Sequence, residues 1–175
     1  MNSGPIAYRY AKALLKFVQE TGAGEQVYSQ ACALVFRMQE IPAFADAVQK
    51  NSELALDRKM QLLDSALGQP MQVQLRKFVA LVDSQKRIMF LQRMLHSFIE
   101  QYRQANSIKV GKLIAASEVS GLKDRLQEIL SENSGATVLL EEELNPEILG
   151  GFVLELDGSR LDASVAGQLD KIRRE

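Results

Sequence analysis

Few side chains in this sequence are able to do chemistry, and none of them has a suitable companion. His96 is the only histidine and Cys32 the only cysteine. A catalytic site requires a nucleophile, a base and a group that orients the base, or else a set of metal ligands. His96 stands in an amphipathic segment without a recognisable nucleophile motif, so we interpret it as a surface or edge residue. Cys32 borders an apolar stripe and is interpreted as an inert, packed thiol.

Two further patterns resemble ligand sites. Three consecutive glutamates at 141–143 offer carboxylates for a hard cation. Successive side chains of an extended segment point to alternating sides, however, so a solvated acidic edge is the better interpretation. The glycines of "TGAGE" (21–25) and "LGGF" (149–152) resemble parts of phosphate-binding loops, which follow a strand and lead into a helix. Neither stretch has that context, so the sequence predicts no catalytic residue, no metal and no cofactor.

The elements that carry these residues fall into two groups. Up to residue 104, apolar side chains recur three or four positions apart in six successive segments, as Tyr10, Leu14 and Phe17 do in the first. Glycine and proline separate the segments, for example in "TGAG" (21–24) and in "LGQP" (67–70). Six amphipathic helices with short connections predict a compact six-helix bundle over residues 1–104.

The pattern changes after residue 105. The stretches "IKVGKLIA", "ATVLLEEE" and "GFVLEL" read as strands, with a helix between the first two and another helix at the C-terminus. Residues 105–175 are therefore predicted to form a small α+β module. The expected fold class is mainly α, with an N-terminal six-helix bundle followed by this module.

Charge also separates the two halves. Residues 1–104 carry 13 Lys and Arg against 9 Asp and Glu, a net of +4, whereas residues 105–175 carry 8 against 13, a net of −5. Opposite signs indicate two modules with different partners. The basic residues are too few and too scattered to indicate a nucleic-acid partner. No apolar run of about 18 residues predicts a membrane-spanning helix, and the single cysteine without a leader-like N-terminus favours a cytoplasmic protein.

The helical half offers a possible docking surface. Ala11 and Ala13 in the first segment are small, while Phe78 and Val79 in the fifth are large and lie near lysine and arginine. Small residues beside larger apolar ones can leave a shallow groove that accepts an amphipathic helix from another protein. The alternative is that these are core positions, and periodicity alone favours the core.

Motifs along the whole chain resemble the ATP synthase delta subunit family, whose mitochondrial counterpart is the oligomycin-sensitivity-conferring protein. "IAYRYAKALLKFV" (6–18) is similar to the opening pattern of that family, carried here by Arg9, Tyr10, Ala11, Lys12, Ala13 and Leu14. "FVALVDSQKRIMFLQRMLHSFIEQY" (78–102) is similar to its fifth and sixth helices. The stretch "NPEILGGFVLELDGSRLDASV" (145–165) is similar to its C-terminal signature, carried here by Pro146, Gly150, Gly151, Asp162 and Ser164. Ala163 stands where the family often has glycine.

The resemblance implies a function without chemistry. It implies a stator subunit that joins the catalytic head to the peripheral stalk, so that the head does not turn with the rotor. The implied partners are the N-terminal helix of the head's alpha subunit, bound by residues 1–104, and the stalk b subunits, bound by residues 105–175. Membrane contact would be indirect, at the cytoplasmic face of the bacterial inner membrane. The implied groove residues, from the first and fifth helices, are Tyr10, Ala13, Leu14, Phe78, Val79 and Val82.

The C-terminal signature itself is interpreted as structural. Asn145 is expected to cap a helical turn begun by Pro146, two glycines to swing the backbone into a strand, and Asp162 to cap the last helix. An alternative for the whole chain is a helical adaptor of another multi-subunit assembly. A nucleotide-binding enzyme that uses the glycines ranks behind both.

Overall fold

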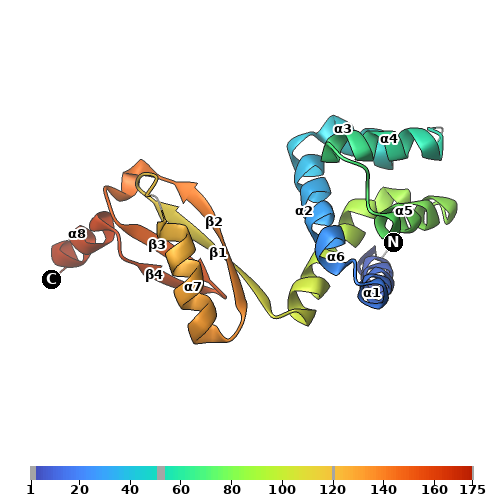
Figure 1. Ribbon diagram of the computed structural model, residues 1–175. Coiled ribbons are helices and arrows are strands. Elements are labelled where there is room, and N and C mark those ends of the chain that lie inside the picture. Colours follow the sequence, from blue (N-terminus) through green and yellow to red (C-terminus); the bar gives the residue numbers. More distant parts are fainter. Residues whose placement is uncertain (1–2, 51–53, 120, 175) are drawn as a thin grey trace. The chain divides into compact units, whose positions relative to one another are not determined.

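The computed structural model describes residues 3–50, 54–119 and 121–174. The described chain is mainly helical, as expected, and contains one four-stranded sheet. Clustering of its contacts divides it into two compact units, Met1–Tyr102 and Arg103–Glu175, which we call the helical unit and the C-terminal unit. Figure 1 shows the helices of the first unit and the sheet of the second, and each unit has its own apolar core.

The helical unit is built from helices throughout its described residues. These are α1 (Ser3–Thr21), α2 (Gly24–Glu40), α3 (Pro42–Gln49), α4 (Leu56–Leu67), α5 (Val73–Ser84), the 3₁₀ turn η1 (Ile88–Phe90) and α6 (Leu91–Ala105). Pro42 occupies the first helical position of α3, where its missing N–H costs nothing. Gly68 ends α4 in the left-handed conformation. The unit departs from a plain six-helix bundle because η1 interrupts the apolar segment that continues into α6.

The core of the helical unit draws on every helix. Among its fully buried large side chains are Leu14, Leu34, Leu63, Leu75 and Phe98. Burying one such side chain contributes roughly 1.5–3 kcal/mol. The helical spacing of apolar residues in the sequence therefore indicates which face of each helix packs into this core.

Buried polar contacts fix the start of α5. The Gln30 side chain donates from Nε2 to the Pro70 carbonyl oxygen (3.1 Å) and accepts from the Gln72 backbone N–H (2.8 Å). Near the other end of α5, the ammonium of Lys59, which is 3% exposed, lies 2.7 Å from the Asp83 carboxylate. Buried polar groups that keep their partners tolerate little displacement, because separating them leaves a costly unpaired group. These contacts therefore tie α5 and the residues that precede it to α2 and α4.

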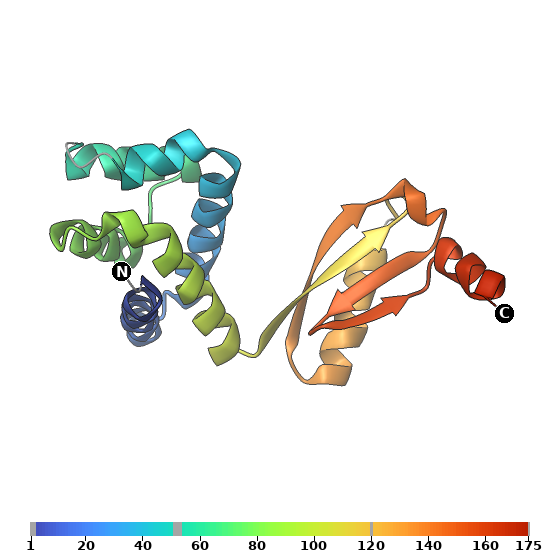
Figure 2. The ribbon, with the colours of Figure 1, turned by 180° about the vertical axis from the view of Figure 1, so that it is seen from behind.

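The C-terminal unit is a small sheet with one helix packed on it. Its elements are β1 (Ile108–Ala115), α7 (Leu122–Ser134), β2 (Thr137–Leu144), η2 (Pro146–Ile148), β3 (Phe152–Leu156), β4 (Ser159–Asp162) and α8 (Val165–Arg174). The strand order is β2-β1-β3-β4, with β1 and β2 parallel and the other pairs antiparallel. Figure 1 shows α7 in front of the sheet, and Figure 2 shows the opposite face. The buried core under α7 is Leu113, Val138, Leu140 and Leu154.

Strand β4 was not expected from the sequence. It forms a hairpin with β3, and the two residues between the strands, Asp157 and Gly158, have φ values of 50° and 75°. Two left-handed residues in succession are typical of the type I′ turn that matches the twist of a hairpin, and "DG" is a strong signal for that turn.

The outer edge of β2 is partly covered by α7. The backbone N–H of Val138 donates to Ser131 Oγ (3.0 Å), and that of Leu140 donates to Gln127 Oε1 (2.8 Å). Both N–H groups point away from β1, because successive N–H groups of a strand point to opposite sides and those of Thr137 and Asn145 donate to Ser107 and Ala115 on the β1 side. Side chains of α7 thus satisfy donors that an edge strand otherwise leaves open.

None of the described helices combines the length and the apolar character that crossing a membrane requires.

Candidate functional site

The candidate site is a groove between α1 and α5, which pack side by side. It encloses a cavity of about 220 Å³, lined by Tyr10, Ala13, Leu14, Phe17, Lys77, Phe78 and Leu81. The four α1 residues are spaced i, i+3, i+4 and i+7, so one face of α1 forms one wall of the groove. Ala13 is exposed and has only a methyl group, which leaves room between its larger neighbours.

The residues expected in the groove divide into three levels. Ala13 is at the surface and Tyr10 is half-buried, while Leu14 and Phe78 are 1% and 5% exposed and form the floor. Val79 and Val82 are each 0% exposed and belong to the core of the helical unit, so they do not line the groove. The structure corrects this part of the prediction: both valines lie on the face of α5 that turns inward, where no partner reaches them.

Three lining residues were not expected. Phe17 lies two turns beyond Tyr10, and Leu81 lies three positions beyond Phe78, so helical spacing could have indicated both. Leu81 is 51% exposed, an unusual degree of exposure for a leucine beside a groove. Lys77 supplies the only charged side chain among the lining residues. Its alkyl stem can lie along the apolar surface while the ammonium stays in water.

Tyr10 is held firmly at the groove. Its hydroxyl oxygen accepts a hydrogen bond from Arg87 Nη1 (3.0 Å), and the Arg87 guanidinium carbon lies 5.6 Å from the centre of the Tyr10 ring. The ring also meets Phe78 edge to face, with centroids 6.5 Å apart. Such contacts each contribute about 0.5–1.5 kcal/mol. A fixed aromatic wall binds with little loss of side-chain entropy, which suits a docking surface.

The remaining residues considered as chemical candidates show no catalytic arrangement. His96 Nε2 lies 3.2 Å from Gln39 Nε2 in an exposed contact, and Cys32 packs against the core of the helical unit. The three glutamates at 141–143 are all exposed on β2. Throughout 3–50, 54–119 and 121–174, no three or more His, Cys, Asp or Glu side chains gather in a way that could hold a metal ion. The glycines of "TGAGE" join α1 to α2, and those of "LGGF" precede β3.

The first half of the C-terminal signature joins η2 to β3. Asn145 Oδ1 accepts from the Glu147 backbone N–H (3.0 Å), and Pro146 begins η2, as expected. Gly151 has a φ of 72°, and a Cβ placed on it would lie 2.2 Å from the Ala163 carbonyl oxygen. Gly150 is also crowded, because its added Cβ would lie 3.1 Å from Val165. The glycine pair therefore permits a close approach between the start of β3 and the turn before α8.

The second half of the signature caps α8, although by a different residue than expected. Ser164 precedes the first helical residue, and its Oγ accepts from the Gly167 backbone N–H (3.0 Å). Asp162 contacts the cap residue and not the helix itself: its Oδ1 accepts from Ser164 Oγ (2.5 Å) and from the Ser164 backbone N–H (3.0 Å). These bonds, that of the hydroxyl first, hold the pKa of Asp162 below its ordinary value of 3.8. Ser164 is thus the helix cap, and Asp162 orients it.

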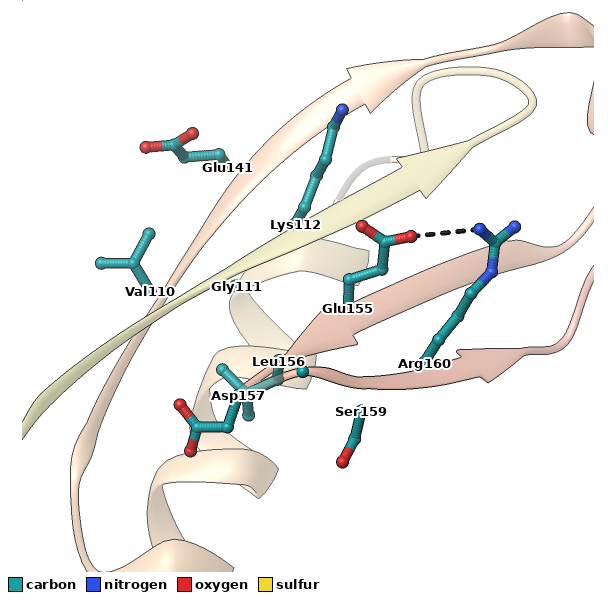
Figure 3. A pocket seen from close by; sticks show the side chains of 10 residues that line it. Val110, Gly111, Lys112, Glu141, Glu155, Leu156, Asp157, Ser159 and Arg160 are labelled. Carbon is teal, nitrogen blue, oxygen red and sulfur yellow. Dashed lines mark hydrogen bonds and ion pairs between the residues drawn. The ribbon is translucent and has the colours of Figure 1, made fainter.

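A second hollow lies on the open face of the sheet (Figure 3). It has a volume of about 420 Å³, and side chains of alternating charge cross the four strands in direct register there: Glu141, Lys112, Glu155 and Arg160. Arg160 Nη1 lies 3.2 Å from Glu155 Oε1. Lys112 also binds Glu143, whose hydrogen bond raises the pKa of the lysine. The two cations that line this hollow are thus engaged by carboxylates of neighbouring strands, so their main role is to join the strands.

The lining of the groove between α1 and α5 is suited to binding rather than to reaction. Its walls are aromatic and aliphatic, with one ammonium group and one tyrosine hydroxyl. This arrangement defines a class: a protein whose helical unit can bind an apolar surface. Residues 6–175 match the model of the family described as "ATP synthase delta (OSCP) subunit". The chain belongs to this family.

Curated relatives agree over the full length. The ATP synthase subunit delta of Phocaeicola vulgatus is 34% identical over 177 residues, which cover 100% of this chain and 95% of the relative. That of Bacteroides fragilis is 34% identical over 179 residues, with the same coverage. That of Lactobacillus delbrueckii subsp. bulgaricus is 33% identical over 171 residues, covering 95% of this chain and 93% of the relative.

A solved structure shares the fold. A chain in the cryo-EM structure of the Toxoplasma gondii mitochondrial ATP synthase hexamer matches with a TM-score of 0.63 and 19% identity, covering 96% of this chain and 95% of that one. Family membership makes this chain a structural, non-catalytic subunit of the ATP synthase stator. It thereby removes the alternative of an adaptor in an unrelated assembly.

Proposed function

We propose that this chain links the catalytic head of a bacterial ATP synthase to its peripheral stalk, at the cytoplasmic face of the inner membrane. In this proposal residues 1–104 bind the N-terminal helix of the alpha subunit, and residues 105–175 bind the b subunits. The observation that carries the proposal is the groove between α1 and α5, whose apolar lining has helical spacing. Membership of the delta subunit family supports it.

The groove suits an amphipathic helix for a physical reason. A helix laid between two others buries apolar side chains spaced three and four apart, and the groove offers Tyr10, Phe17 and Leu81 to receive them. Apolar burial of roughly 25 cal/mol per Å² supplies affinity that salt does not screen. A stator contact must persist through every catalytic step, and such burial keeps dissociation slow.

A second contact, made by residues 105–175, strengthens the link because both binding units belong to one chain. Once one unit is bound, the other searches for its partner at a high effective concentration. The opposite net charges of the two halves, +4 and −5, can favour a different partner for each half and speed assembly. The link would then resist torque better than either contact alone.

A titration with the full chain tests the groove. A synthetic peptide of the alpha-subunit N-terminus from the same organism is titrated calorimetrically into the wild type and into Ala13→Asp. Ala13 is exposed, so the helical unit should tolerate the aspartate, but a bound helix would bury its charge against apolar side chains. We expect affinity to fall at least about tenfold, or about 1.4 kcal/mol.

Ala43→Asp is the matched control, because Ala43 is also an exposed helical alanine but lies on α3, away from the groove. It should leave affinity unchanged. Equal binding by the wild type and Ala13→Asp would remove the groove from the proposal. Absence of any heat with the wild type would remove the alpha-subunit partner.

A further inference from the structure

The polar groups at the groove all offer hydrogen-bond donors. Lys77 lines the groove with an ammonium group. Tyr10 accepts from Arg87 through its hydroxyl oxygen, so its own proton is left to donate. Arg87 uses Nη1 for this bond, and its guanidinium group has further N–H donors. A partner that places acceptors along the groove would therefore find donors on α1, on α5 and in the turn that follows α5.

The two cations have no carboxylate of their own. Within the described residues, neither Lys77 nor Arg87 is part of an ion pair. Asp83, which stands between them in the sequence, is held by Lys59 at 2.7 Å. Asp64, on α4, is held by Arg76. The acidic groups of this region are committed elsewhere, whereas the groove keeps its positive charge unbalanced.

We propose that the groove selects an amphipathic helix that carries a carboxylate beside its apolar stripe, and that Lys77 and the Arg87–Tyr10 pair recognise this carboxylate. The inference rests on the proposed function and specifies the chemistry of the partner at that same site. The apolar stripe fills the space above Ala13, and the acidic side chain at its margin accepts from the donors. Lys77 and Arg87 are then specificity-determining residues.

The physical basis is charge-assisted hydrogen bonding at a partly dehydrated rim. When a helix covers the groove, water leaves the surroundings of Lys77, and an ammonium without a partner becomes unfavourable. A carboxylate on the incoming helix compensates this loss and forms a stronger bond than two neutral groups would. A neutral or basic helix with the same apolar stripe receives no such compensation, so the charge contributes discrimination more than total affinity.

Two designed peptides of equal length test the proposal on the full chain. Each is a capped, fluorescently labelled helix with leucines spaced to fill the groove, and the residues flanking the leucines are glutamate in one and glutamine in the other. Binding is measured by anisotropy. On the wild type we expect the glutamate peptide to bind about three- to tenfold more tightly, as for a well-placed ion pair near a surface.

Variants then assign this preference to particular side chains. Lys77→Gln and Arg87→Gln should each reduce the ratio of the two affinities, and the double variant should bring it to about one. The ratio is the readout because a general disturbance of the groove would weaken both peptides equally. Lys86→Gln is the matched control: Lys86 is exposed and adjacent to Arg87 but does not line the groove, so it should leave the ratio unchanged.

The outcomes separate this inference from the proposed function. If both peptides bind the wild type equally and Ala13→Asp abolishes both, the carboxylate selection is wrong while the groove remains a docking site. If the ratio persists in the double variant, other residues recognise the carboxylate and the assignment fails. If Ala13→Asp leaves both peptides bound, the groove is not their site; the carboxylate selection then fails, and the groove is removed from the proposed function.

Discussion

The helical unit and the C-terminal unit hold their folds together by different means. The helical unit buries an extended core to which each of its described helices contributes, whereas the cluster under α7 in the described C-terminal unit has four buried side chains, Leu113, Val138, Leu140 and Leu154. The small unit instead relies on backbone geometry: a left-handed glycine pressed against a carbonyl, a serine cap, and side chains that satisfy an edge strand.

This difference indicates how each unit tolerates change. A large core distributes stability over many side chains, so a single cavity weakens it without changing its topology. A thin core leaves the topology to a few backbone positions, where a single methyl group can prevent closure. Substitution of a core side chain in the helical unit and of a backbone glycine in the C-terminal unit tests this comparison directly.

Phe98→Ala should cause the largest loss and should affect the helical unit. Phe98 is 0% exposed, and truncation of a buried phenylalanine typically costs about 3–5 kcal/mol. All four tyrosines lie in residues 1–102, so tyrosine fluorescence during urea denaturation reports on this unit alone. Phe36→Ala, at a position 55% exposed, should change stability by less than about 0.5 kcal/mol. Similar losses in both variants would contradict the assigned core.

Gly151→Ala should cause a smaller loss that is confined to the C-terminal unit. Gly158→Ala is the control, because Gly158 has a similar φ of 75° but its Cβ would meet nothing within 4 Å. Both variants incur about 1–2 kcal/mol for a left-handed alanine. Gly151→Ala should incur a further 1–3 kcal/mol or so from overlap with Ala163. Amide hydrogen exchange of β1–β3 measures the difference, and equal losses would show that the close approach does not matter.

The smallest expected effect is a pH dependence of the α8 cap. The folded pKa of Asp162 lies below its ordinary value of 3.8 because Ser164 donates two hydrogen bonds to it. The stability that the ionised Asp162 carboxylate contributes to the fold is therefore present above the unfolded pKa, and it is lost as the pH falls through the folded pKa. Between about pH 5 and about pH 2, protection of α8 amides should fall more in the wild type than in Asp162→Asn. An identical fall in both would exclude Asp162 as the cause.

The two units also differ in how far their folds can be predicted from the sequence. Helix positions in the helical unit follow from spacing alone, because each helix buries one stripe in a common core. Strand β4 was missed because four residues carry too little alternation to stand out, although the "DG" before it was a usable turn signal. The parallel pairing of β1 with β2 depends on the crossover through α7, which no local pattern encodes.

The sequence indicated which helices form the candidate site, but not which of the residues named there are exposed and which are buried. Spacing puts Tyr10, Leu14 and Phe78 on helix faces, but it does not distinguish a groove floor from the core below. Val79 and Val82 were placed at the groove because the family resemblance implied it, but both lie on the buried face of α5. Arg87 was missed because its contact with Tyr10 spans 77 positions of the sequence.

The covered edge of β2 has a consequence for how the chain behaves before assembly. An open edge strand can recruit the same strand of another copy and begin a growing chain of identical subunits. Here Ser131 and Gln127 occupy two of the donors such a copy would need, and the glutamates at 141–143 would face their equals across the new junction. The covered edge therefore disfavours edge-to-edge association of this chain with a second copy of itself.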